Sequence, residues 1–148
     1  MVYLTIDEKT LKAGQTHRRG GAHIDGIWMP EIQAHGTTPT PGHRNPSKAG
    51  WDTPPSPTWG RSSGGGGLML VSSVAGCRAW NGQFHGEPGE GGDCEHMRDQ
   101  LDAAESLVMQ PETVYLCNVW AVHESIPVER DMRRSLVRIS LPETAIVQ

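Results

Sequence analysis

The chain has 148 residues and a formal net charge of −4, from 13 basic and 17 acidic side chains. This length predicts a single domain that spans residues 1–148. The longest apolar stretches are far shorter than the ~20 residues that cross a bilayer, and the charged amino terminus lacks the apolar stretch of a signal peptide. The sequence has no basic run, which argues against a general nucleic-acid-binding protein.

The composition favours short strands joined by many turns. Glycine and proline contribute 18 and 11 residues, which is about a fifth of the chain. In chain order the predicted strands are 2–6, 68–73, 113–126 (bent near Asn118) and 134–141, and a short helix is predicted over 97–105. Such a series of elements predicts an all-β sandwich or jelly roll with at most one or two short helices.

Two long segments rich in glycine and proline, residues 30–67 and 81–96, are predicted to be loops. Connections of that length are uncommon in compact domains and are usually functional or mobile. The first segment contains Trp51 and Trp59, which are candidates for a lid over a site. Trp28, Trp80 and Trp120 are expected in the core rather than in a substrate platform.

The three cysteines, Cys77, Cys94 and Cys117, are an odd number without a secretory context. We therefore expect reduced thiols and a cytoplasmic location rather than a disulfide framework. A zinc site that combines the cysteines with His96 is the alternative, although its spacing matches none of the common paired CxxC patterns.

The most informative motif is His23-x-Asp25 together with a distant His123. Residues i and i+2 of a strand point to the same face, so an imidazole and a carboxylate would project side by side. His123 stands at the end of an apolar stretch, and Arg133-Arg134-Ser135 opens the last predicted strand ten residues later. Two histidines and one carboxylate are the ligands of the facial triad that binds non-haem Fe(II).

In these residues the sequence resembles the 2-oxoglutarate- and Fe(II)-dependent oxygenases. The resemblance covers roughly residues 23–141, and it implies a double-stranded β-helix (jelly-roll) core. It also implies that His23, Asp25 and His123 are the iron ligands and catalytic residues. Fe(II) would be the cofactor and 2-oxoglutarate the small-molecule cosubstrate.

The family places an arginine about ten residues after the distal histidine, often as Arg-x-Ser, to bind the far carboxylate of 2-oxoglutarate. Arg133 and Ser135 match this pattern and share a strand face with the apolar Val137 and Ile139, so we expect them to face inward. The alternative is the opposite face of the strand, which carries Arg134 and Arg138.

The sequence therefore predicts a 2-oxoglutarate- and Fe(II)-dependent dioxygenase that hydroxylates an unidentified substrate. Two other functions fit a jelly roll. One is a non-catalytic structural or assembly subunit, for example of a virion, which would be a homo-oligomer. The other is a cupin-like metalloprotein that does not use 2-oxoglutarate.

Overall fold

The computed structural model describes residues 2–25, 58–60 and 67–141, and they are mostly β-sheet with one short α-helix, α1 (Arg98–Ala103). Two single turns of 3₁₀ helix, η2 (Glu90–Gly92) and η3 (Glu95–Met97), precede α1. This content confirms the predicted all-β class with few helices. No helix within the described residues is long and apolar enough to cross a membrane.

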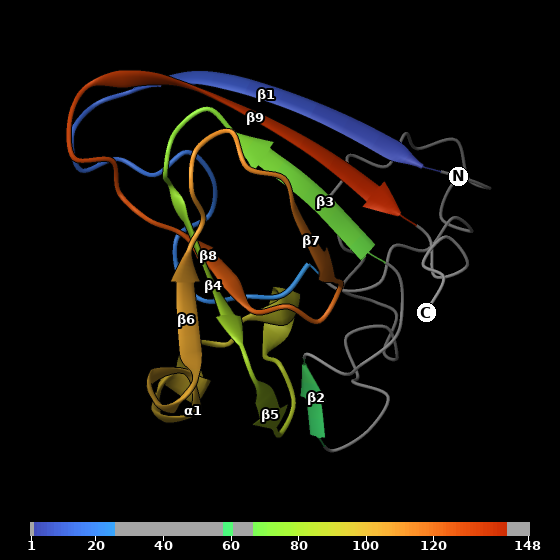
Figure 1. Cartoon of the computed structure of the whole chain (residues 1–148). Coiled ribbons are helices and arrows are strands. Elements are labelled where there is room, and N and C mark those ends of the chain that lie inside the picture. Colours follow the sequence, from blue (N-terminus) through green and yellow to red (C-terminus); the bar gives the residue numbers. More distant parts are fainter. Residues whose placement is uncertain (1, 26–57, 61–66, 142–148) are drawn as a thin grey trace.

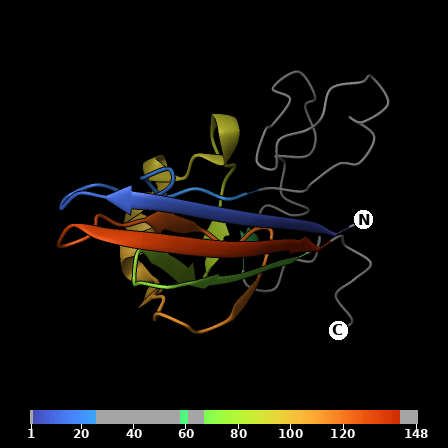
Figure 2. The same ribbon diagram turned by 90° about the horizontal axis from the view of Figure 1, so that it is seen from above.

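The larger sheet has four antiparallel strands in the order β1-β9-β3-β7 (Figures 1 and 2). Its strands are β1 (Tyr3–Leu11), β9 (Met132–Leu141), β3 (Gly67–Ser72) and β7 (Tyr115–Asn118). β1 and β9 pair along their whole length, from Tyr3 opposite Ser140 to Leu11 opposite Met132. The first and last described strands are therefore neighbours.

The smaller sheet has the strand order β6-β4-β8 and lies below the larger sheet in Figure 1. Its strands are β6 (Glu105–Val108), β4 (Cys77–Asn81) and β8 (His123–Ser125). On the free side of β8, His23 forms an antiparallel bridge with His123 and extends the sheet by one short segment. A separate pair consists of β2 (Thr58–Gly60) and β5 (Gln83–His85).

Two apolar clusters hold these layers together. The first lies between the sheets, where Leu68, Leu70 and Leu136 of the larger sheet meet Cys77 and Met109. The second lies on the other side of the smaller sheet, where its side chains pack against α1 and the β2–β5 pair. This second cluster includes Trp59, Trp80, Phe84, Leu101 and Trp120.

The outer face of the larger sheet is apolar and exposed at its β1 edge. Leu4 and Ile6 are 61% and 65% exposed, while the polar Thr5 and Asp7 between and after them are half-buried. Leu4 lies opposite Ile139, and Ile139 lies opposite Met69 on β3. Apolar alternation in these strands therefore marks the outward face, which is the reverse of the usual pattern.

The predicted strands near both ends and at 68–73 correspond to β1, β3 and β9, and the predicted helix corresponds to α1. The prediction of one bent strand over 113–126 is wrong, because a turn at 119–120 and the irregular residues 121–122 separate β7 from β8. The predicted loop at 81–96 is also partly wrong, since it contains β5 and both 3₁₀ turns. Of the predicted loop at 30–67, residues 30–57 and 61–66 lie outside the described residues, while 58–60 form β2.

Candidate metal centre

A pair of backbone hydrogen bonds brings the two histidines of the predicted triad together. The amide of His23 donates to the carbonyl of His123, and the amide of His123 donates to that of His23, both at 2.9 Å. Directly paired residues project their side chains to the same face of a sheet. The ring centroids of His23 and His123 are accordingly 4.5 Å apart.

Asp25 completes the cluster because it is two residues beyond His23. Its Oδ2 lies 3.7 Å from Nε2 of His123, and one ligand atom from each of the three residues falls within 4.8 Å of the others. Ligands bonded at ~2.1 Å on one face of an octahedral ion lie ~3 Å apart, so small side-chain rotations would close the cluster around a metal. The structure thus brings together all three predicted ligands.

The hydrogen bonds of the two imidazoles select the tautomer that a metal requires. Nδ1 of His23 lies 2.7 Å from the carbonyl oxygen of Gly21, and Nδ1 of His123 lies 3.0 Å from that of Ala121. A carbonyl oxygen only accepts, so each Nδ1 carries the proton. In the neutral rings, Nε2 then holds the lone pair, as in histidines that bind metals with backbone support.

His23 is 9% exposed, and this burial shapes its charge. Removal from water, reinforced by the neighbouring His123, lowers the pKa of His23 to about 4. The ring is therefore neutral at pH 7 and able to donate its lone pair without first losing a proton.

A cavity of about 320 Å³ adjoins the three residues. Its apolar walls include Leu68, Leu70 and Leu136, and its basic side chains are Arg18, Arg19 and Arg138. Nη1 of Arg138 donates to both carboxylate oxygens of Asp25, at 3.1 and 3.2 Å. A cavity with this lining suits a small anionic ligand next to a metal.

Arg133 and Ser135 are not brought to this cavity. The side chain of Arg133 is 70% exposed and forms an ion pair of 2.7 Å with Glu8 on β1, and the Ser135 hydroxyl also donates to Glu8. The prediction that this face of β9 points inward is wrong, because the outer face of the larger sheet is the apolar one. The inward face carries Arg134 and Arg138 instead.

Arg134 and Arg138 differ in what they can reach. Arg134 is fully buried, and it donates to the Ser72 hydroxyl, the Gly76 carbonyl and the Cys77 sulfur. Its donors are therefore occupied by hydrogen bonds that connect β9 to β3 and β4. Arg138 lines the cavity, and its buried Nε has no hydrogen-bond partner.

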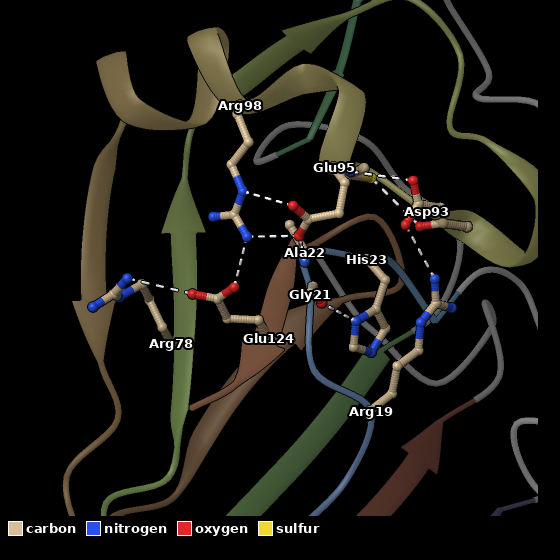
Figure 3. A network of polar contacts seen from close by, with 11 residues as sticks. Arg19, Gly21, Ala22, His23, Arg78, Asp93, Glu95, Arg98 and Glu124 are labelled. Atoms are coloured by element: carbon tan, nitrogen blue, oxygen red, sulfur yellow. Dashed lines mark hydrogen bonds and ion pairs between the residues drawn. The ribbon is translucent and has the colours of Figure 1, made fainter. Parts of the chain in front are cut away.

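A polar network on the far side of the smaller sheet fixes the segment that carries His23 (Figure 3). The Glu95 carboxylate accepts a short hydrogen bond from the amide of Ala22 and two more from Arg98, at 2.6 and 3.0 Å. Arg98 also donates to Glu124 at 2.9 Å. Because Glu124 follows His123 on β8, the network connects the backbones of both histidines.

The charges in this network support one another. Hydrogen bonds from Arg98 and Ala22 lower the pKa of Glu95, and Glu95 and Glu124 raise the pKa of Arg98. Glu124 is 8% exposed and lies between Arg98 and Arg78, which donates to it at 3.3 Å. Sequence reasoning missed these residues, and the position of Glu124 next to His123 was the one available signal.

The three cysteines are free thiols, in line with the main expectation for them. The alternative zinc site is wrong, because among the described residues the cysteines do not gather with His96 into a group of metal-ligand atoms. Trp59 is fully buried against Phe84 and Trp120, with ring centroids 5.5 and 6.2 Å away, so it is a core residue and not a lid. Trp28 and Trp51 lie outside the described residues. Trp80 and Trp120 are in the core, as expected.

No protein-family model, curated protein or solved structure matches this chain.

Replacing Glu95 with alanine should weaken binding of a divalent metal about tenfold or more, because the Ala22 amide and Arg98 lose the carboxylate that positions His23. The free energy of unfolding should fall by only ~1 kcal/mol, since the lost contacts are partly exposed. Co(II) titration followed by visible absorption measures the affinity. Glu87→Ala, which removes an exposed carboxylate, is the matched control, and equal affinities in the two variants would rule out the positioning role.

The metal-free protein should lose stability as the pH falls from about 6.5 to 4. The pKa of His23 is about 4 in the folded state and ~6.5 when unfolded, so the unfolded chain binds more protons in that window. The loss from this group should approach ~3 kcal/mol. The free energy of unfolding, measured with urea across this pH range, should depend less on pH in His23→Gln than in His96→Gln, the control at an exposed histidine. If the free energies of unfolding of the two variants changed with pH in parallel, the loss of stability could not be assigned to His23.

Proposed function

We propose that this protein is a 2-oxoglutarate- and Fe(II)-dependent dioxygenase built on a jelly roll. The observation that carries the proposal is the convergence of His23, Asp25 and His123, with both Nε2 atoms available as ligands. This is the ligand set of the facial triad, which leaves coordination positions open for small molecules.

The strand pairing supports the jelly-roll part of the proposal. A jelly roll is a long hairpin of eight strands rolled up, so the first strand pairs with the eighth, the second with the seventh, and so on inward. If the His23 segment counts as the second strand, and the β2–β5 pair is set apart, the eight strands end with β9. The four expected pairs are then β1–β9, His23–β8, β3–β7 and β4–β6, and all four are antiparallel neighbours.

The residues of the chain have separate tasks in this reaction. The two histidines and Asp25 would hold Fe(II), which supplies the redox chemistry that couples O₂ consumption to oxidation of 2-oxoglutarate and substrate. Arg138 would hold a carboxylate of 2-oxoglutarate, since its guanidinium lines the cavity beside Asp25. The apolar walls from Leu68, Leu70 and Leu136 would exclude water from the reacting groups.

Anaerobic titration with Fe(II) and 2-oxoglutarate tests this function. The wild-type protein should bind one iron per chain and develop the visible charge-transfer band of an iron–ketoacid chelate. Asp25→Ala and His123→Ala should abolish the band, because each removes one of three ligands, whereas His96→Ala should retain it.

The same titration discriminates the alternatives. Iron binding that 2-oxoglutarate does not perturb would favour a cupin-like metalloprotein. Failure of the wild-type protein to bind iron would overturn the enzyme assignment and leave a structural jelly roll.

Arg138→Gln should raise the concentration of 2-oxoglutarate needed for half-saturation of the band by about tenfold or more, because a charged, bidentate donor is lost. Iron affinity in the absence of 2-oxoglutarate should persist, since Asp25 remains. Arg133→Gln is the matched control and should behave like the wild type, because that side chain faces solvent. The reverse pattern would reinstate the Arg-x-Ser assignment.

A further inference from the structure

A second cavity, of about 480 Å³, opens between β6 at the edge of the smaller sheet and β7 at the edge of the larger one. Ala79, Met109 and Cys117 line it on the side of the apolar cluster between the sheets. Leu107 and Leu116 line it where they are 47% and 64% exposed. Its volume lies within the ~300–1,000 Å³ range of small-molecule sites.

The two cavities differ in charge. Arg18, Arg19 and Arg138 line the first cavity, whereas no lysine, arginine or histidine is among the described residues that line the second. Glu105 is the one acidic residue in that described lining. A carboxylate or phosphate that enters the second cavity would lose its hydrating water without gaining a cationic partner. An uncharged group has no charge to desolvate, and a cationic group would have Glu105 nearby.

The second cavity adjoins the candidate metal centre across the strands. Ala79, which lines the second cavity, lies directly opposite His123 in the β4–β8 pair. Cys117, which also lines it, lies opposite Leu68 of the first cavity in the β3–β7 pair. The Asp25 carboxylate is near enough to contribute, after burial, to a rise in the pKa of the Cys117 thiol to about 12.

We propose that the second cavity binds the primary substrate, and that the substrate presents to it an apolar group, aromatic or aliphatic, that is uncharged or positively charged. The inference rests on the proposed function, because it assigns the two cavities to the two organic reactants. The anionic cosubstrate enters the basic cavity, and the substrate enters the apolar one.

Three probes of one shape test the charge preference: benzylamine, benzyl alcohol and benzoate. Their dissociation constants are measured by ligand-observed NMR on the full chain. Benzylamine and benzyl alcohol should bind, and benzoate should bind about tenfold more weakly or not at all. Leu107→Arg should weaken the binding of benzylamine about tenfold and strengthen the binding of benzoate. Leu4→Arg, which changes an exposed leucine on the outer face of the larger sheet, should preserve the original order.

The proximity to the metal centre is read from the same samples. Mn(II), which would occupy the site as a redox-stable substitute for Fe(II), should shorten the relaxation times of the ring protons of bound benzylamine, and Zn(II) should not. Equal binding of benzoate and benzylamine, or an order that Leu107→Arg leaves unchanged, would overturn the site. If the probes bind in the predicted order but Mn(II) does not shorten their relaxation times, the second cavity is a ligand site but not the substrate site.

Failure of the proposed function gives a different result. If the chain binds neither iron nor 2-oxoglutarate but still binds the probes in the predicted order, the dioxygenase assignment and the substrate role fall together, and a ligand site remains. If iron and 2-oxoglutarate bind but the probes do not, the inference alone fails.

Discussion

The two hydrogen bonds between the backbones of His23 and His123 are the constraint on which the site depends. They join residues 100 positions apart and extend the smaller sheet by the His23 segment, which also forms a bridge with Asp93 on its other side. Because paired residues share a face, the same bonds align the two imidazoles. Asp25, two residues beyond His23, reaches the same cluster.

The surroundings of the histidines fit a site that is ready before any ligand arrives. Backbone carbonyls fix both tautomers, so neither ring has to reorient to offer Nε2. The Glu95–Arg98–Glu124 network supports the same segment from the opposite side of the smaller sheet. Burial of Glu124 is acceptable because Arg78 and Arg98 both donate to it, whereas a lone carboxylate at that position would be strongly destabilising. Stability and ligand geometry therefore depend on the same contacts.

The sequence was sufficient to predict β1, β3 and β9 and to name the three candidate ligands. His23 and Asp25 stood out by their two-residue spacing, whereas His123, which is distant in the sequence, was named through the family resemblance. The sequence was not sufficient to predict which face of β9 points inward. Val137 and Ile139 made the Arg133 face resemble a core face, but they belong to an exposed apolar surface that also includes Leu4 and Ile6. The inward face instead carries Arg134, fully buried by hydrogen bonds to β3 and β4 that no spacing in the sequence reveals. The network around Glu95 was missed for the same reason, since its members meet only after folding.

Charge balance connects the candidate metal centre to the cavity beside it. Asp25 and Arg138 form an ion pair with no net charge, and their side chains are only 20% and 13% exposed. A divalent cation bound by Asp25 would compete with Arg138 for the carboxylate and leave the guanidinium in need of an anion. A dicarboxylate would supply that anion, and the divalent cation and the dicarboxylate together would add no net charge to the cavity. Each would then bind more tightly in the presence of the other, by the same factor. The pairing of Asp25 with Arg138 is thus a physical reason for a basic cavity to adjoin this cluster. The second cavity has no basic residue in its described lining and remains for a different ligand.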